Sequence, residues 1–364
     1  MAQKIRVGLI FGGRSGEHEV SVLSAKSVME AMDPAKYEVF PIGITKKGEW
    51  LPGISPLRLA AEQKLEVLPG ETEPRSTEML TLENTKGQIL GGLSRNLDVI
   101  FPILHGPYGE DGTMQGLLEL AGIPYIGGGV LASALGMDKA LMKVVFQQEG
   151  LPIGDYLAVL RHDWEKTPDT ILADVEEKIG YPCFIKPANL GSSVGISKAH
   201  NRDELKKALD HASAFDRRIV VEAFIDGREV ECSVLGNDDP IASVPGEVVP
   251  CAEFYDYEAK YVLNDSKLII PANLPKETAE TVRALAVRAF KSVDCAGMAR
   301  VDFFVTHRDG RVIINEINTL PGFTRISMYP KLWEASGIGY AELIDRLIQL
   351  AIERYQDRQR NRVS

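Results

Sequence analysis

The sequence predicts an α/β protein in which an N-terminal parallel sheet is followed by smaller α+β units. Three observations carry this prediction. The chain has 364 residues, of which 45% are hydrophobic and 25% charged, so it is long enough for two or three globular domains. Strand and helix signals alternate in its first third, as in a parallel sheet. Its middle section instead shows a strand, a turn, a strand and a helix in close succession.

The first third begins with a β-α-β unit. Ile5–Phe11 is an apolar, β-branched run that ends at a pair of glycines. Val20–Met32 has apolar residues at helical spacing, and Tyr37–Ile44 is a second strand. This order predicts a doubly wound parallel sheet with right-handed crossovers. The polar stretch Leu51–Gly92 is expected to hold surface connections and a hairpin, before a further strand at Val99–Leu104.

The remaining elements follow from the same reading of periodicity. In the middle section we expect a helix, three strands and a second helix: Asp138–Gln148, Tyr156–Leu160, Cys183–Lys186, Val194–Ser197 and Arg202–Ala214. The last section predicts a strand, an irregular stretch through Tyr261, a helix, two strands and a final helix. Their ranges are Glu229–Leu235, Lys276–Val293, Met298–Val305, Val312–Asn318 and Ala341–Tyr355.

Charge and composition argue against several classes of protein. The formal net charge is −10, which disfavours general binding to nucleic acid or acidic lipid. The uncharged stretch Leu120–Met137 contains five glycines and a proline, so it predicts turns rather than a membrane span. Four cysteines without a CxxC pair indicate neither a zinc site nor a disulfide framework. A reducing cytoplasm is the expected location.

The segment Lys186-Pro-Ala-Asn-Leu-Gly-Ser-Ser-Val-Gly195 has the character of a phosphate site. A lysine at a strand end, followed by a Gly/Ser turn, places a cation beside backbone N–H groups. The chain has no Gly-Lys dipeptide, which excludes a Walker P-loop. The alternative interpretation of this segment is a glycine-rich β-hairpin with a surface lysine and no ligand. The segment also reads GxSxG, but the strand expected after it disfavours a hydrolase nucleophile elbow, which requires a helix.

A second group of residues predicts a site for a hard cation. Alternation along two adjacent strands puts Arg300 and Asp302 on one face, and likewise Glu316 and Asn318. Three side chains with oxygen donors and no nearby Cys or His favour magnesium held together with phosphates. The alternative is an ion-paired sheet face in which Arg300 neutralises the acids. Burying two carboxylates against one guanidinium is costly, which favours the metal.

Two further loops follow the carboxyl ends of N-terminal strands, where ligands bind in open parallel sheets. The first, Gly12–Ser21, does not have GxGxxG spacing, so NAD is not expected. Its Glu17 could pair with a substrate ammonium or simply complement the helix dipole. The second loop, His105–Gly116, is rich in glycine, and His105 could hydrogen-bond a carboxylate or serve the fold alone.

Taken together, these segments resemble the D-alanine–D-alanine ligase family of the ATP-grasp superfamily. The resemblance covers nearly the whole chain, in the family's order: GGRSGEHEVS, HGPYGEDGTMQG, MDKALMK, KPANLGSSVG, YDYEAKY, GMARVDFF and NEINTLPGFTRISMYP. It implies a three-domain ATP-grasp architecture, with ATP held between the last two domains. The implied boundaries are 1–136 for the N-terminal α/β domain, 137–226 for the small central domain and 227–364 for the C-terminal domain.

The resemblance also implies a nucleotide site. Lys139 and Lys186 would contact the phosphates, with the loop that includes Ser193 covering them. The remaining ATP-binding residues implied are Glu222, Ala223, Ile225, Glu229, Lys260 and Phe304. The family often has Lys where Ala223 stands, so only a backbone contact to adenine could be shared there. Asp302, Glu316 and Asn318 would hold two Mg²⁺ or Mn²⁺ ions.

For the amino acid substrates, the resemblance implies separate sites for the first and second D-alanine. Glu17 would bind the ammonium of the first, networked with Ser192 and Tyr261. Arg300 and the Gly322 amide would form the oxyanion site. The residues implied around the second amino acid are His105, Ser327 and Met328.

The implied reaction joins two D-alanine molecules through an acyl phosphate, for peptidoglycan precursor synthesis. Because that intermediate hydrolyses readily, Phe254–Asn264 is expected to act as a lid. A D-Ala–D-lactate or D-Ala–D-Ser ligase is the near alternative, and a serine hydrolase the distant one. The resemblance further implies a homodimer, while neither nucleic acid nor membrane is expected as a partner.

Overall fold

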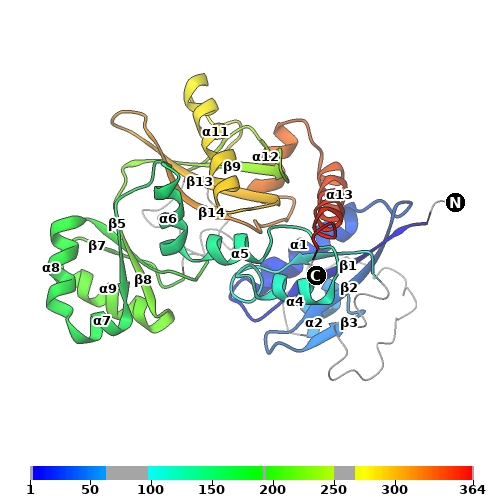
Figure 1. The fold of residues 1–364 in the computed structure, drawn as a ribbon, viewed down its shortest axis with the longest axis horizontal. Helices are drawn as coiled ribbons and strands as arrows, with labels where there is room; N and C mark the ends of the chain where they lie inside the picture. Colours follow the sequence, from blue (N-terminus) through cyan, green and yellow to red (C-terminus); the bar gives the residue numbers. More distant parts are fainter. Residues whose placement is uncertain (1–2, 63–96, 192–193, 250–266, 363–364) are drawn as a thin grey trace.

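The protein is described here as a computed structural model covering residues 3–62, 97–191, 194–249 and 267–362. Within these residues, three separate sheets follow one another in sequence (Figure 1). In Figure 1 the N-terminal unit lies at the right, the central unit at the left, and the C-terminal sheet between and above them. The predicted mixture of α/β and α+β architecture is therefore confirmed.

The N-terminal sheet has the predicted parallel arrangement. Its strands are β1 (Ile5–Gly12), β2 (Tyr37–Ile44), β3 (Trp50–Pro52) and β4 (Val99–Ile103), in the order β3-β2-β1-β4. Strand β1 pairs in parallel with β2 and β4, and β3 adds antiparallel to β2. Helices cover both faces: α1 (His18–Ala31) packs on one and α4 (Thr113–Ala121) on the other. The short helix α2 (Pro56–Glu62) precedes a segment outside the described residues.

The central unit is a four-stranded antiparallel sheet with helices on its outer side. Its strands, in the order β5-β8-β6-β7, are β5 (Tyr156–Leu160), β8 (Arg218–Ala223), β6 (Cys183–Pro187) and β7 (Ser197–Ala199). The helices are α7 (Arg161–Lys166), α8 (Pro168–Lys178) and α9 (Arg202–Phe215). This unit has its own apolar core, which includes Trp164, Val175 and Leu209.

One predicted strand of the central unit is wrong. Val194 and Gly195 form a turn, and the strand β7 begins only at Ser197. The physical reason is the backbone of Gly195, whose φ of +74° is in the left-handed region that a strand cannot adopt. A Cβ at Gly195 would also lie 2.8 Å from Pro187 Cγ, so the close approach requires glycine.

The C-terminal sheet is antiparallel, and β9 is its central strand. The order is β12-β11-β9-β13-β14, with β10 added to β9. The ranges are β9 (Gly227–Gly236), β10 (Ile241–Ala242), β11 (Gly246–Val249), β12 (Lys267–Ile269), β13 (Gly297–Thr306) and β14 (Val312–Asn318). Helix α11 (Lys276–Ser292) packs on one face through Val282, Ala286 and Phe290. The predicted strands and this helix are thus confirmed to within a few residues.

Four more helices tie the units together. They are α5 (Val130–Met137), α6 (Lys139–Gln148), α12 (Met328–Ala335) and α13 (Tyr340–Arg358). Helix α13 shares a core with the N-terminal sheet, since Leu343 and Leu347 lie in the same apolar cluster as Val7 and Leu9. Helix α6 contributes Phe146 and Met142 to the core of the C-terminal sheet. Consequently, α6 stands between the central and C-terminal sheets (Figure 1).

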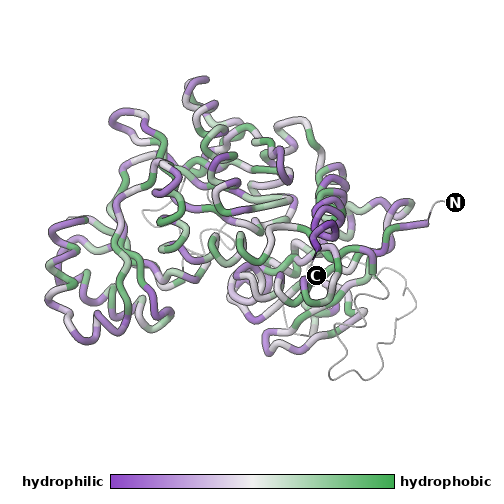
Figure 2. The backbone as a smooth tube through the Cα atoms, viewed as in Figure 1, coloured by the Kyte–Doolittle hydropathy of each residue, from purple (hydrophilic) through white to green (hydrophobic). Residues whose placement is uncertain are grey.

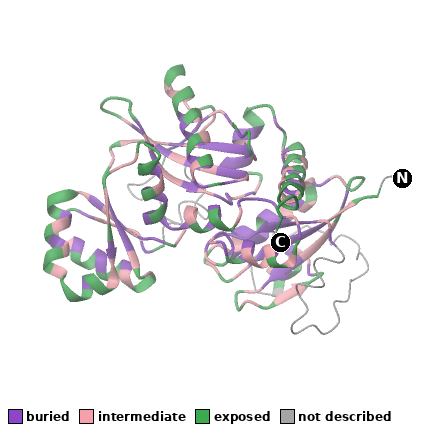
Figure 3. Cartoon of the chain, viewed as in Figure 1, coloured by how far each residue is buried: buried purple, intermediate pink, exposed green. Residues whose placement is uncertain are grey.

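The distribution of hydropathy agrees with this layering. Figure 2 shows hydrophobic stretches along the strands and hydrophilic stretches on outer helices such as α8 and α13. Figure 3 shows buried residues along the strands of the N-terminal and C-terminal sheets, with the exposed residues on the outer helices. In the described part of the chain, no helix is long and apolar enough to span a bilayer.

Candidate functional site

A cavity of about 380 Å³ lies between the central and C-terminal sheets. Its walls come from β6 and β8 on one side and from β9, β13 and β14 on the other, with α6 closing one end. The described residues predicted to bind ATP all line it: Lys139, Lys186, Glu222, Ala223, Ile225, Glu229 and Phe304. Asp302 and Glu316 of the predicted metal site line the same cavity. Residues far apart in the sequence therefore converge in one place.

Strand register explains how the central sheet presents its charged side chains to this cavity. Glu222 of β8 pairs directly with Phe184 of β6, and Lys186 pairs with Val220. Because residues two apart share a face, Lys186 and Glu222 are diagonal neighbours on the same side of the sheet. Lys198 of β7 pairs with Phe184 and joins that face, with its ammonium 4.7 Å from the ring centroid of Phe224. One face of the small sheet is thus polar and directed at the cavity.

Glu222 is held by two lysines. Lys186 Nζ lies 2.5 Å from Glu222 Oε2, and Lys143 Nζ lies 2.8 Å from Glu222 Oε1. Burial alone would raise the pKa of Glu222, but the charges of Lys186 and Lys143 lower it far below its usual value. Glu222 is therefore ionised at neutral pH. Lys143 was not predicted from sequence, although its position one helical turn after Lys139 is a usable signal.

The N-terminus of α6 fixes the other phosphate candidate, Lys139. The side chain of Asp138 caps the helix by accepting from the backbone amides of Ala140 (3.1 Å) and Leu141 (3.0 Å). Lys139 Nζ donates to the carbonyl of Leu190 at 2.7 Å and lies 3.7 Å from Glu316 Oε2. The ammonium of Lys139 is thus held between the loop after β6 and strand β14. Both predicted phosphate-binding lysines face the same space as Glu316.

The β13–β14 ladder presents the predicted cluster of charges. Arg300 pairs across the ladder with Asn318, and Asp302 pairs with Glu316, so all four side chains share a face. Arg300 donates to both carboxylate oxygens of Asp302 at 2.7 Å. It also lies 2.9 Å from Glu231 Oε2 on the neighbouring strand β9. The guanidinium is therefore fixed by two carboxylates, and Glu231 is a member of the site that sequence reasoning missed.

Asp302, Glu316 and Asn318 are the residues predicted to hold a metal ion. Among the residues that the structure describes, no three Asp, Glu, His or Cys side chains gather closely enough to hold a metal ion. The predicted set has two carboxylates, Asp302 and Glu316, and the amide of Asn318. Hard oxygen donors of this kind suit magnesium that completes its shell with phosphate oxygens and water. The residues fit such an ion, with Arg300 as the present partner of Asp302.

The N-terminal loops bring Glu17 and Glu110 close to the loop after β6. A Cβ placed on Gly191 would lie 3.1 Å from Glu17 Oε2 and 3.8 Å from Glu110 Oε1. The amide of Gly106 donates to Glu110 Oε1 at 2.8 Å. Burial, reinforced by the charge of Glu17, raises the pKa of Glu110 to about 8. Glu110 was not singled out from the sequence, although it lies in the glycine-rich loop that includes His105.

A pH-dependent stability follows from Glu110. Its pKa is about 8 in the fold and 4.5 in an unperturbed glutamate, so the folded state holds a proton that the unfolded state loses between those pH values. Stability contributed by this proton is lost as pH rises through that window. Glu110→Gln should therefore be more stable than the parent at pH 9, by on the order of 3 kcal/mol, with little difference at pH 4. Urea unfolding of both proteins at the two pH values measures this; an equal pH effect in both would contradict it.

His105 is buried and its tautomer is set by one contact. His105 Nδ1 lies 3.2 Å from the carbonyl oxygen of Leu320, which can only accept, so Nδ1 carries the proton. Burial lowers the pKa of His105 and keeps the ring neutral, despite the opposing charge of Glu17. Its Nε2 is buried and has no hydrogen-bond partner among the described residues. That nitrogen is a free acceptor beside the N-terminal loops.

The loop between β14 and α12 and the first residue of α12 hold the remaining predicted residues. Ser327 Oγ accepts from the amide of Thr324 at 3.1 Å and would lie 3.1 Å from a Cβ on Gly322. Ser327 and Gly322, which the resemblance assigns to the second amino acid and to the oxyanion site, are therefore adjacent. Met328 is only 6% exposed and packs with Val248 and Leu332. Its side chain is part of an apolar wall.

Several predicted residues lie outside the described part of the chain: Ser192, Ser193, Lys260, Tyr261 and the expected lid Phe254–Asn264. The hydrolase alternative loses support from the elements nearby. After Gly195 the next element is the strand β7, whereas a nucleophile elbow leads directly into a helix.

Comparisons with known proteins agree with the motifs and with the fold. The family described as "D-ala D-ala ligase N-terminus" matches residues 6–128, and "D-ala D-ala ligase C-terminus" matches residues 145–349. A D-alanine–D-alanine ligase of Ruminiclostridium cellulolyticum is 57% identical over 98% of both chains. One from Geobacillus thermodenitrificans is 51% identical, again over 98% of each.

Solved structures give the same result at lower identity. The structure of the D-alanine–D-alanine ligase from Coxiella burnetii superposes with a TM-score of 0.80 at 36% identity, covering 99% of this chain and 97% of that one. A D-Ala:D-Ser ligase from Enterococcus faecalis also reaches 0.80, at 32% identity, over 96% of this chain and all of its own. The fold is thus shared over nearly the whole chain.

Proposed function

Because the chain belongs to the D-alanine–D-alanine ligase family, we propose that it joins two D-alanine molecules to D-alanyl-D-alanine while converting ATP to ADP and phosphate. The observation that carries this proposal is the convergence of the phosphate lysines, the oxygen-donor face of β13–β14 and the glutamates of the N-terminal loops. Lys139 Nζ lies 3.7 Å from Glu316, and Glu17 lies against the loop after β6. A nucleotide and an amino acid can therefore meet at one boundary.

We propose that three domains, 1–136, 137–226 and 227–364, have separate roles in the reaction. Each of these ranges contains one of the three sheets. The nucleotide would lie between the second and third domains, where the 380 Å³ cavity is. Glu222, Ala223, Ile225 and Glu229 would surround the base and ribose, and Phe304 lines the opposite wall. The first D-alanine would lie against the N-terminal loops, with its ammonium paired to Glu17.

The first step makes the carboxylate reactive. An oxygen of the first D-alanine's carboxylate attacks the γ-phosphorus, the bond to the β-phosphate oxygen breaks, and ADP leaves. Lys139 and Lys186 offset negative charge on the transferring phosphoryl group. Asp302, Glu316 and Asn318 would hold magnesium, or manganese, which when bound supplies charge stabilisation for the phosphates.

The second step forms the peptide bond. The unprotonated amine of the second D-alanine attacks the acyl carbon, and the tetrahedral intermediate collapses with release of phosphate. Arg300, fixed by Asp302 and Glu231, would face the developing oxyanion together with the Gly322 amide. His105, Ser327 and Met328 would surround the second amino acid.

A simple assay tests this function. Phosphate release from ATP should require D-alanine, and D-alanyl-D-alanine should appear in equal amount. Phosphate release that is independent of D-alanine, or absent in its presence, would contradict the proposal.

Acceptor choice within the family is expected to depend on Tyr261, which lies outside the described residues. A tyrosine here would hydrogen-bond toward Ser192 and Glu17, holding the closed site. Tyr261→Phe should retain ATP binding and gain measurable D-Ala–D-lactate synthesis, most clearly at mildly acidic pH, where the competing amine is protonated. Product ratios from pH 6 to 9 with both acceptors present measure this. Indistinguishable ratios for parent and variant would reject the role.

The same proposal extends to the cell. D-alanyl-D-alanine would serve peptidoglycan precursor synthesis, which places the enzyme in the cytoplasm beside its ATP supply. We also propose that it acts as a homodimer, and sedimentation of the purified protein tests this directly.

A further inference from the structure

Lys143 lines the nucleotide cavity, and the proposed mechanism does not use it. It lies on α6, one helical turn after Lys139, so both lysines project from one face of the helix. Its side chain is only 3% exposed, and its Nζ lies 2.8 Å from Glu222 Oε1. The ammonium also lies 5.7 Å from the ring centroid of Tyr156. A lysine buried this deeply at a ligand site requires an electrostatic reason.

That reason is the contact of Glu222 with two cations, one at each carboxylate oxygen. One carboxylate oxygen of Glu222 contacts Lys143, and the other contacts Lys186 at 2.5 Å. Glu222 is itself only 11% exposed at its side chain, so it needs a partner to stay ionised in the fold. Lys186 alone could provide this, yet Lys186 is also, with Lys139, one of the two lysines proposed to contact the nucleotide phosphates. One ammonium would then serve two anions.

Competition for Lys186 begins when a nucleotide enters. A polyphosphate attracts the same ammonium that pairs with Glu222, and an ammonium has only three donors. If Lys186 turned away from Glu222 with no second cation present, a buried carboxylate would be left unpaired. Breaking a buried ion pair in that way is strongly unfavourable, because it leaves an uncompensated buried charge. Lys143 removes this cost because it remains on the other oxygen.

We propose that Lys143 is a positioning residue for nucleotide binding, which neutralises and fixes Glu222 so that Lys186 is available to the nucleotide phosphates. This inference rests on the proposed function only in taking the occupant of the cavity to be a nucleoside polyphosphate. Lys143 acts through Glu222 and does not touch the phosphates. It thereby explains why α6 carries two lysines at this spacing.

Titration calorimetry with MgADP alone tests the inference on the purified full-length protein. Lys143→Met should raise the dissociation constant for MgADP about tenfold, equal to ~1.4 kcal/mol, because Lys186 is then retained by Glu222. Lys143→Arg keeps the charge and should restore binding to within about threefold of the parent. In steady state, Lys143→Met should raise the KM for ATP far more than it lowers kcat.

The Glu222→Gln background separates this mechanism from a direct contact. A neutral amide does not hold Lys186, so adding Lys143→Met to Glu222→Gln should change the dissociation constant by less than about twofold. If the full tenfold loss persists in that background, Lys143 contacts the nucleotide itself and the proposal is overturned. A Lys143→Met variant that binds MgADP like the parent also overturns it, whatever its thermal stability.

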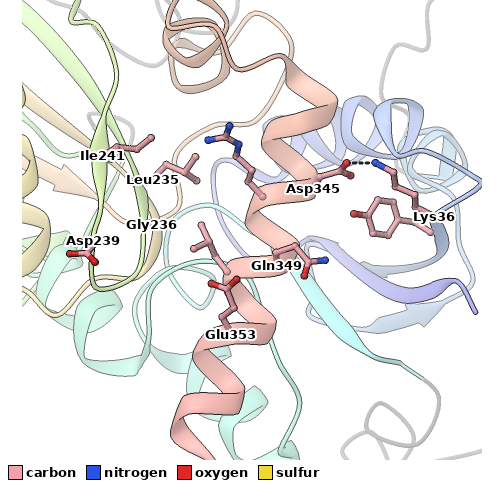
Figure 4. Close-up of a pocket in the computed structure, with 11 residues that line it drawn as sticks. Lys36, Leu235, Gly236, Asp239, Ile241, Asp345, Gln349 and Glu353 are labelled. Atoms are coloured by element: carbon pink, nitrogen blue, oxygen red, sulfur yellow. Dashed lines mark hydrogen bonds and ion pairs between the residues drawn. The ribbon is translucent and has the colours of Figure 1, made fainter. Parts of the chain in front are cut away.

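A matched control is available at a second cavity, far from the nucleotide site. Lys36 and Asp345 form an ion pair at 2.6 Å on the wall of a cavity of about 610 Å³ beside α13 (Figure 4). Lys36→Met removes the same functional group from an ion pair and should leave MgADP binding unchanged. Failure of the parent to form dipeptide, with the Lys143 pattern intact, would overturn the proposed function and leave this inference standing.

Discussion

Arg300→Met is expected to lower kcat for dipeptide formation by about 1,000-fold while the protein still binds nucleotide. Loss of one oxyanion donor typically costs ~10²–10³ in rate. Arg300 also neutralises two carboxylates, Asp302 at 2.7 Å and Glu231 at 2.9 Å, which the variant leaves without this guanidinium. The measurement is steady-state kinetics at saturating D-alanine and ATP, with MgADP affinity as the check on folding.

Two comparisons sharpen that result. Arg311→Met removes an exposed arginine that pairs with Asp309 at 2.8 Å at the far end of the same hairpin, and should leave kcat unchanged. Arg300→Lys keeps the charge but loses the bidentate contact, so it should remain well below the parent. A kcat for Arg300→Met within about tenfold of the parent would remove Arg300 from the reaction.

Glu316→Gln has the second-largest expected effect, on the order of 100-fold in rate at limiting magnesium. The substitution preserves size but removes one of two carboxylates in the predicted metal set, and it leaves Lys139 Nζ facing a neutral group 3.7 Å away. Rate against magnesium concentration is the measurement, and raised magnesium should recover part of the loss. The fold should be retained, since the side chain is only partly buried.

The exposed Glu342 offers a control for Glu316. It pairs with Arg346 at 2.7 Å on α13, away from the cavity. Glu342→Gln should therefore give the parental magnesium dependence. Near-normal turnover of Glu316→Gln at limiting magnesium would show that β14 does not hold the ion.

Much of the site could be predicted because period-two alternation determines which residues share a strand face. Arg300, Asp302, Glu316 and Asn318 were placed together from spacing alone, and the β13–β14 register puts them opposite one another. The strands expected at Tyr37–Ile44, Tyr156–Leu160 and Val312–Asn318 are confirmed with the same bounds. Strand β8 was not predicted, although its run Ile219–Val221 is β-branched throughout. Sequence reasoning succeeds where alternation within a single strand determines which side chains share a face.

Other features depend on contacts between elements, which spacing does not encode. Lys143 and Glu231 read as ordinary charged residues until packing brings them to Glu222 and Arg300. The strand expected at Val194–Ser197 failed because β-branched propensity was outweighed by the left-handed backbone of Gly195. Helix α8 was not predicted, although Pro168 at its first turn is a start signal.

The most direct test of the central claim follows an oxygen atom. If the carboxylate of the first D-alanine is activated by phosphoryl transfer, one of its oxygens remains with phosphorus when the amine displaces phosphate. D-Alanine labelled with ¹⁸O in both carboxylate oxygens should therefore yield inorganic phosphate carrying one ¹⁸O per dipeptide formed. Phosphate without the label, measured by mass spectrometry during active dipeptide synthesis, would contradict the acyl-phosphate account.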